Sequence, residues 1–124
     1  TGYTPVPSTK KYLLTPADKQ IQKTALGAEL TVPWEKRTDI IILLSELKQA
    51  GFVCYALEQD PRSIPYTSVG DSEKIALLVG NEVDGVPEEL RAVCDAILEI
   101  PMHGTKNSLN VSVATGIALY ELIK

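Results

Sequence analysis

The sequence lacks a long apolar run, and it lacks any excess of basic charge. No stretch approaches the roughly 20 consecutive apolar residues of a membrane-spanning helix, and no basic segment leads into an apolar one at the N-terminus. We therefore expect a protein of the cytoplasm with no membrane partner. The net charge of −4 argues against nucleic-acid binding over the whole protein surface, because phosphate binding depends on lysine and arginine.

Cysteine is also scarce, and its placement excludes the usual metal and redox motifs. Cys54 and Cys94 each lie inside an apolar stretch, with neither CxxC nor Cys/His spacing. We predict two buried free thiols in preference to a disulfide or a metal site, and no bound metal.

What the chain does have is the composition of one globular domain: 124 residues, 44% hydrophobic and 23% charged. Its charge is uneven, because residues 1–37 carry six basic and three acidic side chains and the remainder carries six and thirteen. A polyanion would therefore bind near the first third. Scattered, solvated lysines explain the same pattern equally simply.

Helical and extended patterns alternate along the chain. The predicted helices are Asp18 to Ala28, residues 40–47 capped by Asp39 and ended by Gly51, Pro87 to Val93, and Ser108 to Lys124. The predicted strands are Phe52 to Leu57, Ile75 to Val79 and Ala96 to Ile100, with an extended piece from Leu30 to Trp34. Residues 1–16 and 58–73 are predicted loops, the second with a single turn around Ile64.

Apolar strands that alternate with helices predict an α/β fold, a parallel sheet with helices on both faces. The closing helix is apolar nearly all round, which predicts that it is buried.

Three loops leave the carboxyl ends of the predicted strands, where parallel sheets bind ligands. Gly80 and Gly85 bracket one of them and would let a flat ligand approach the backbone, although glycines after a strand are also ordinary turn residues. In another, Ser108 and Asn110 straddle Leu109 directly before the closing helix. Either polar residue alone could be a simple N-cap.

Two segments carry a family resemblance. LLVGNEVDGVPEEL and EIPMHGTKNSLNVSVATGIALYEL resemble the second and third motifs of the SpoU/TrmH branch of the SPOUT RNA methyltransferases, G-x-E-x-x-G and I-P-M-x-G-x-x-x-S-L-N-V-S-V-A. TALGAEL and GFVCYALEQD extend the similarity more weakly. The resemblance implies a deep C-terminal trefoil knot and a homodimer. It also implies methyl transfer from S-adenosylmethionine to a ribose 2′-hydroxyl of tRNA or rRNA.

The same resemblance assigns site residues by position. The residues implied to bind S-adenosylmethionine are Ala56, Leu57, Gly80, Gly85, Ile100, Met102 and Leu109. The polar residues implied to organise the catalytic end of the site are Glu82, Ser108 and Asn110.

The family's first motif, N-x-G-x-x-x-R, has no match in the chain. In the family its arginine removes the proton from the ribose hydroxyl, which neither Asn110 nor Glu82 is expected to do. We expect the first strand, the first helix and this arginine to precede Thr1. Residues 1–124 would then be a single SPOUT domain, incomplete at its N-terminus, that binds the methyl donor but catalyses poorly.

Two other functions stay open. One is a non-catalytic knotted module that binds S-adenosylmethionine or RNA, and the other is an unrelated doubly wound domain that binds a nucleotide phosphate at Gly80 to Gly85. The histidine and some aromatic residues need no role in catalysis. We expect His103 to be a solvent-facing ring, and Trp34 and Phe52 to lie in the core or on a dimer surface. Tyr3 and Tyr12 either contact RNA or belong to a loop that becomes ordered on binding.

Overall fold

The computed structural model describes residues 5–8, 13–106 and 108–123. Tyr3, Tyr12 and Lys124 lie outside the described residues, so the expectations for them stay untested. Contacts divide the chain into two compact units, Thr1–Asp39 and Ile40–Lys124. In the part of the chain that the structure describes, no helix is both long and apolar enough to cross a bilayer.

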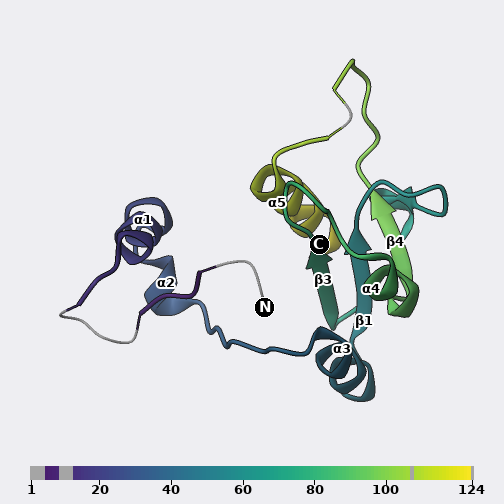
Figure 1. The fold of residues 1–124 in the computed structure, drawn as a ribbon. Helices are drawn as coiled ribbons and strands as arrows, with labels where there is room; N and C mark the ends of the chain where they lie inside the picture. The colour runs from purple at the N-terminus through teal and green to yellow at the C-terminus, as the bar shows by residue number, and fades with distance from the viewer. Residues whose placement is uncertain (1–4, 9–12, 107, 124) are drawn as a thin grey trace. The chain divides into compact units, whose positions relative to one another are not determined.

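The first unit contains two short helices, α1 (Pro16–Ala25) and α2 (Ala28–Thr31) (Figure 1). Thr15 caps α1, and its hydroxyl and main-chain N–H both donate to the Asp18 carboxylate, in a reciprocal capping box. These bonds hold the pKa of the buried Asp18 below its usual value. The helix therefore begins two residues before the predicted start, because Asp18 is its third residue and Pro16 its first.

The extended piece predicted from Leu30 to Trp34 is wrong at its start. Leu30 and Thr31 complete α2, which begins after left-handed conformations at Leu26 (φ 51°) and Gly27 (φ 97°) have ended α1. A single left-handed residue is a common helix stop, but two left-handed residues followed by a new turn of helix have no recognisable sequence pattern.

The second unit is built on a parallel sheet, as predicted, but the sheet has four strands rather than the three expected. Its strands are β1 (Val53–Leu57), β2 (Ile64–Pro65), β3 (Ile75–Val79) and β4 (Ala96–Glu99), in the order β2-β4-β1-β3. Tyr55 in the central strand pairs with Leu77 of β3 and with Ala96 of β4. The carboxyl ends of all three longer strands therefore lie at the same end of the sheet.

Helices cover both faces of this sheet, which confirms that expectation (Figure 1). They are α3 (Ile40–Gln49), α4 (Glu88–Val93) and α5 (Val111–Leu122), with a 3₁₀ turn, η1 (Tyr66–Ser68). Tyr55 packs with Ala118 and Leu122 of α5, whereas the next residue, Ala56, packs with Val86 and Leu90 on the α3 and α4 side. Successive side chains of β1 thus serve two separate cores.

Three predictions for this unit need correction. Residues 58–73 are not all loop: Ile64–Pro65 pairs with β4 as a two-residue edge strand, which its proline obscures in the sequence. The closing helix begins at Val111 rather than Ser108. Pro87 is the N-cap of α4 rather than its first residue.

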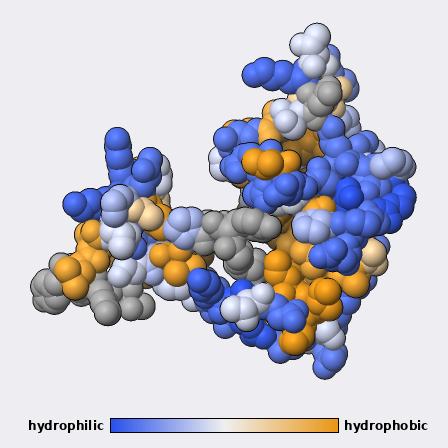
Figure 2. Space-filling view, viewed as in Figure 1, coloured by the Kyte–Doolittle hydropathy of each residue, from blue (hydrophilic) through white to orange (hydrophobic). Residues whose placement is uncertain are grey.

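The closing helix and β3 are also less buried than predicted. On α5, Ala118 and Leu122 are buried, but Val113 is 51% and Tyr120 85% exposed. Contacts with β3 and η1 cover only one side of this helix. Figure 2 shows the resulting hydrophobic surface over α5 and over α3. The strand β3 is half-buried because it lies at the edge of the unit's sheet.

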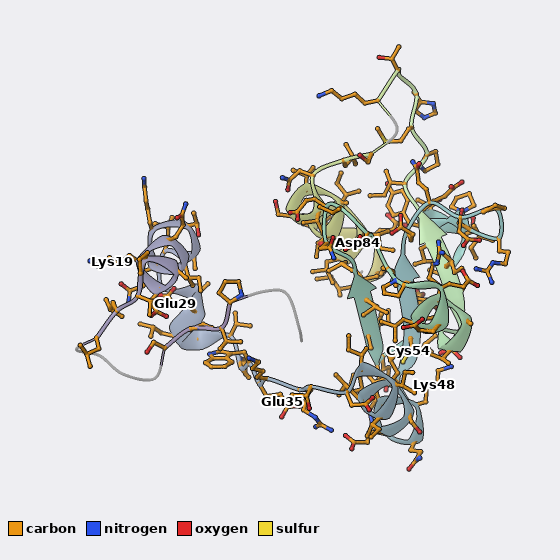
Figure 3. All side chains as sticks on the ribbon, in the orientation of Figure 1. Lys19, Glu29, Glu35, Lys48, Cys54 and Asp84 are labelled. Carbon is orange, nitrogen blue, oxygen red and sulfur yellow. The ribbon has the colours of Figure 1, made fainter. Side chains whose placement is uncertain are left out.

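Asp95, in the bend before β4, joins α3 to β1 at the amino ends of the strands. Its carboxylate accepts hydrogen bonds from the Lys48 Nζ of α3 and the Cys54 main-chain N–H of β1, both at 2.8 Å. The Lys48 bond, followed by the Cys54 bond, lowers the pKa of Asp95, and the same ion pair raises the pKa of Lys48 (Figure 3 labels Lys48 and Cys54).

Cys54 and Cys94 are both free, as predicted, although Cys94 is only half-buried.

Candidate functional site

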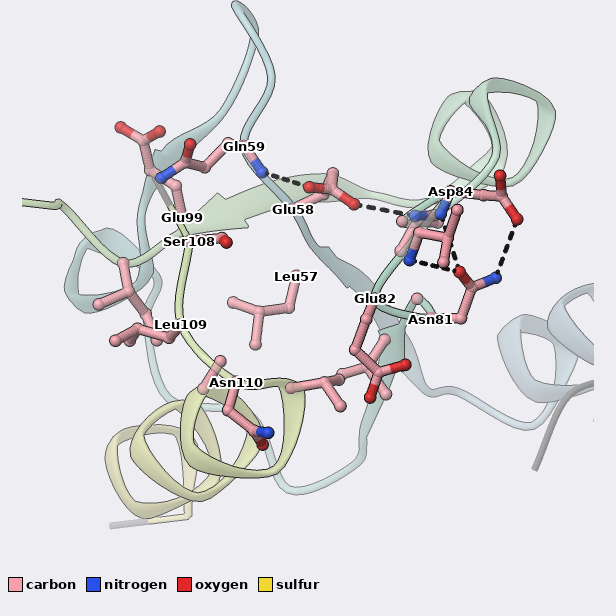
Figure 4. A pocket seen from close by; sticks show the side chains of 18 of the residues that line it. Leu57, Glu58, Gln59, Asn81, Glu82, Asp84, Glu99, Ser108, Leu109 and Asn110 are labelled. Atoms are coloured by element: carbon pink, nitrogen blue, oxygen red, sulfur yellow. Dashed lines mark hydrogen bonds between the residues drawn. The ribbon is translucent and has the colours of Figure 1, made fainter. Parts of the chain in front are cut away.

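A cleft of about 570 Å³ opens at the carboxyl ends of β1, β3 and β4 (Figure 4). Its lining comes mainly from four segments: residues 57–59, the turn at 79–86, the start of the loop after β4, and the first turn of α5 with the residues before it. The three loops that the sequence singled out therefore meet at one place, as expected for parallel strands. The volume is within the usual range for small-molecule sites.

Nine of the ten predicted site residues line this cleft. They are Leu57, Gly80, Glu82, Gly85, Ile100, Met102, Ser108, Leu109 and Asn110. Figure 4 shows Leu57 between the Ser108 to Asn110 segment and the turn that carries Glu82. Ala56 does not line it, because its side chain is fully buried in the core on the α4 side of the sheet. His103 is exposed and outside the cleft lining.

The turn between the two glycines is held by Asn81. Its side-chain oxygen accepts hydrogen bonds from the main-chain N–H groups of Val83 and Asp84, both at 2.8 Å, and its carbonyl accepts from Gly85 at 3.1 Å. The Val86 N–H donates to Glu58 at 2.9 Å. Because these four amides are already bonded inside the protein, the turn offers no ready nest for a phosphate.

The glycines serve the packing of this turn. A Cβ at Gly80 would collide with the backbone of Gly85 and Val86, and Gly85 itself has φ 63°, where an L side chain is strained. The sequence suggested close approach of a ligand, but the close approach that the structure shows is backbone against backbone.

Asn110 is the N-cap of α5. Its side-chain oxygen accepts from the Ser112 N–H at 2.9 Å and from the Ser112 hydroxyl at 2.5 Å. Ser108, two residues earlier, is exposed on the cleft side. Of the two N-cap candidates in the sequence, Asn110 takes that role, and it still faces the cleft.

Sequence reasoning missed an ion-pair cluster beside the cleft. Asp60 accepts from Arg62 Nε at 2.8 Å and pairs with Arg91 at 3.0 Å, and both arginines reach Glu88, at 2.8 and 2.9 Å. The Asp60 side chain is only 4% exposed. The Arg62 hydrogen bonds, more than any other contact, hold the pKa of Asp60 far below its usual value.

This cluster fastens the loop after β1 to α4. Arg91 also lines the cleft, but its Nε is buried and has no hydrogen-bond partner among the described residues. Nothing in the sequence spacing relates Asp60 to an arginine on a helix 31 residues later. Glu58 was missed too, although a carboxylate directly after a parallel strand is a recognisable signal.

The lining of the cleft is acidic. Among the described residues that line it, there are four carboxylates, those of Glu58, Glu82, Asp84 and Glu99, and one cation, Arg91. Such a lining favours a cationic ligand over a phosphate group, since like charges repel more strongly where water is partly excluded. Together with the occupied amides of the turn, it argues against the nucleotide-phosphate alternative.

Comparison with known proteins identifies the family of this chain. Residues 2–120 match the SpoU rRNA Methylase family. The chain belongs to this family. The SpoU/TrmH resemblance of the two motifs is thereby confirmed, and the structure supplies the parallel α/β fold that goes with it.

Several members of the SpoU family are similar to this chain in sequence. The 23S rRNA (guanosine-2′-O-)-methyltransferase RlmB of Xanthomonas axonopodis pv. citri is 36% identical over 104 residues, which are 84% of this chain and 41% of the relative. The tRNA (guanosine(18)-2′-O)-methyltransferase of Aquifex aeolicus is 41% identical over 95 residues, 77% of this chain and 45% of the relative. The chain thus spans less than half the length of these curated relatives.

Solved structures of the family share the fold. The A. aeolicus TrmH/SpoU tRNA modifying enzyme superposes with a TM-score of 0.76 at 38% identity, over 81% of this chain and 51% of that one. An AdoMet-bound rRNA methyltransferase from Sinorhizobium meliloti also gives 0.76, at 29% identity, over 87% of this chain and 41% of that one.

Proposed function

We propose that the protein carrying this chain transfers a methyl group from S-adenosylmethionine to a ribose 2′-hydroxyl of tRNA or rRNA. The observation that carries this proposal is the assembly of nine predicted site residues from three separate loops into one cleft. Family membership supports it, because similar members are named as 2′-O-methyltransferases of 23S rRNA and of tRNA.

The chemistry of the cleft fits S-adenosylmethionine. Leu57, Ile100 and Leu109 offer apolar walls for a flat base, and the carboxylates favour a sulfonium cation. When bound, S-adenosylmethionine supplies an electrophilic methyl group. The chain's contribution is to hold that group in line with the attacking oxygen, and orientation of this kind is worth about 7–11 kcal/mol in favourable systems.

Glu82, Ser108 and Asn110 are proposed to organise the RNA side of the cleft. They lie on both of its walls, on the turn after β3 and on the segment before α5. None of them is proposed as the base for the ribose hydroxyl. That this base is an arginine of the first motif stays a prediction.

The finer features of the family are proposed as well: a trefoil knot formed by the segment that ends in α5, a homodimer, residues 1–124 as one methyltransferase domain, and a cytoplasmic location. The exposed apolar side chains of α5 support the dimer. The acidic lining supports an arrangement in which RNA phosphates are held outside the cleft and only a ribose enters it.

The proposal is tested in the full-length protein by two measurements. Calorimetry with S-adenosylhomocysteine should show micromolar binding that Leu109→Arg abolishes, whereas Leu30→Arg, at an exposed position of α2, should leave it unchanged. Transfer of labelled methyl groups from S-adenosylmethionine to total tRNA or rRNA should follow the same pattern. Binding without transfer would support the non-catalytic module instead, and no binding would contradict both.

A further inference from the structure

Glu58 lies directly after β1 and uses both carboxylate oxygens on main-chain donors. One oxygen accepts from the neighbouring Gln59 N–H at 2.9 Å, and the other accepts from the Val86 N–H at 2.9 Å (Figure 4). The second bond crosses between two loops that are 28 residues apart in the sequence. A charged acceptor makes it one of the stronger kinds of hydrogen bond.

The turn is shaped to receive this carboxylate. A Cβ added at Gly85 would collide with the Glu58 oxygen that bonds Val86, and a Cβ at Gly80 would collide with the Gly85 backbone. Gly80, Gly85 and Glu58 are therefore stacked with no space for a side chain at either glycine. The Glu58 carboxylate thus lies directly between the end of β1 and the turn.

This stacking lies between two parts of the cleft lining. Leu57 and Gln59 line it from the β1 side, and Glu82 and Gly85 line it from the turn. The Asp60 ion-pair cluster joins the same loop to α4, beyond the turn. In the part of the chain that the structure describes, one hydrogen bond joins the β1 loop to the turn itself, and the Val86 N–H donates it to Glu58.

We propose that Glu58 is a positioning residue for the methyl donor: its carboxylate holds the 80–86 turn against the end of β1 and thereby sets the width of the donor cleft. This inference rests on the proposed function.

Variants of the full-length protein separate this role from a general loss of stability. Glu58→Ala removes both acceptors, whereas Glu58→Gln keeps the length and leaves one oxygen for the Val86 N–H. Glu89→Ala is the matched control, because it removes the same charge from an exposed position of α4 that does not line the cleft.

We expect Glu58→Ala to weaken S-adenosylhomocysteine binding about tenfold, Glu58→Gln to weaken it less, and Glu89→Ala to leave it unchanged. The KM for S-adenosylmethionine should rise by a similar factor while the KM for RNA stays the same. A merely structural role would reduce the active fraction without this selective change in KM.

Amide hydrogen exchange provides a readout that needs no ligand. Exchange in the turn, above all at Val86, should accelerate in Glu58→Ala and remain at the wild-type rate in Glu89→Ala. Wild-type exchange or wild-type donor affinity in Glu58→Ala would overturn the proposal. Should that variant fail to fold, Glu58→Gln decides by the same two measurements, with smaller changes expected.

Gly85→Ala provides a second check through a double-mutant cycle. In the wild-type background the new methyl group has two costs: strain from the left-handed backbone and a clash with the Glu58 carboxylate. In Glu58→Ala only the backbone strain remains. The double variant should therefore bind S-adenosylhomocysteine more tightly than the product of the two single losses predicts. An additive result would contradict the stacking and, with it, the proposal. A wild-type protein that fails to bind S-adenosylhomocysteine would instead contradict the proposed function.

Discussion

Gly80 and Gly85 are both required by the turn after β3, but for different physical reasons. Gly85 needs its left-handed φ of 63°, which other residues adopt only at a cost. The φ of Gly80 is ordinary, and its constraint is steric, because a Cβ there would meet the backbone of the opposite end of the turn. Backbone cannot rotate away as a side chain can. Even the smallest side chain at Gly80 must therefore open the turn.

Gly80→Ala should consequently lower both stability and donor binding. We expect about 1–3 kcal/mol of lost unfolding free energy, as for other overpacked sites, and a loss of S-adenosylhomocysteine affinity of about tenfold or more. Gly104→Ala is the control, since a Cβ there meets nothing within 4 Å. Urea unfolding and calorimetry measure the two effects. Equal behaviour of the two variants would show that the turn can open without cost.

Cys94 should be an unreactive thiol despite its partial exposure. Burial raises its pKa to about 11, so at pH 8 only about one molecule in a thousand carries the reactive thiolate. We expect labelling by a thiol reagent at pH 8 to be on the order of a hundredfold slower than for a free cysteine. Mass spectrometry of the native protein measures this rate, with urea-unfolded protein as the reference. Fast native labelling would contradict the assignment.

Among the elements, the loop after β1 and helix α4 are joined by a cluster of unusual charge density. Asp60 is nearly inaccessible to solvent, yet it stays ionised because two guanidinium groups surround it. Removing one partner from such a cluster leaves an uncompensated charge, which is more costly than the net value of the pair. The cluster therefore rigidifies the β1 side of the cleft as long as Asp60 is charged.

Asp60 should make stability depend on pH in acid. Its pKa is lower in the folded protein than its unfolded value near 3.9, so the unfolded chain binds the proton more readily. The stability that Asp60 contributes is then fully present above about pH 5 and is lost as the pH falls below 4. We expect Asp60→Asn to lower the melting temperature at pH 7 and to converge toward wild type at pH 3. The exposed Asp71, changed to asparagine, should follow wild type at both values. A gap that stays constant with pH would refute the linkage.

Asn110 combines a helix cap with a place in the cleft, and two variants separate these roles. Asn110→Ala removes the acceptor for the Ser112 N–H and should cost about 1 kcal/mol of stability. Asn110→Asp keeps an equally good cap and should lie within a few tenths of wild type. Methyl transfer measured beside urea unfolding then isolates the part of the effect that belongs to the cleft. Stability lost equally in both variants would mean that the cap contributes little.

The sequence predicted elements best where local chemistry and tertiary packing agree. The apolar runs FVCYAL and IALLV revealed β1 and β3, and their parallel arrangement brought the three loops together as expected. The strand β2 was missed because two residues paired by β4 leave no periodicity of their own. The family resemblance assigned Ala56 to the cleft together with Leu57, but neighbouring strand residues face opposite sides of the sheet, and Ala56 is buried on the α4 side. The Asp60 cluster arises from tertiary contacts alone, which spacing does not encode.

At the scale of the whole molecule, every residue that lines the cleft belongs to the second unit. The outer side of α5 in this unit is apolar and exposed, with Val113, Ile117 and Tyr120 spaced so that they share one helix face. An uncovered apolar face of this kind is typical of an interface. It is the surface on which the proposed homodimer can be tested.

Tyr120→Asp should weaken that homodimer. A carboxylate at the centre of an apolar contact loses its hydration without gaining a partner, so we expect the dimer dissociation constant to rise at least about tenfold. Sedimentation velocity of the full-length protein measures this change. Ile41→Asp, on the exposed side of α3, is the control and should leave the sedimentation coefficient unchanged. A Tyr120→Asp protein that sediments like wild type would place any dimer contact elsewhere.

The two edges of the sheet in the second unit differ in a way that affects how the protein can be handled. One edge is β2, which is two residues long and contains a proline, a combination that discourages further strand pairing. The other is β3, five apolar residues long, without a proline or a charge. An apolar edge strand of this kind can pair with a strand of another molecule. At high protein concentration, aggregation should therefore proceed through β3 rather than through β2.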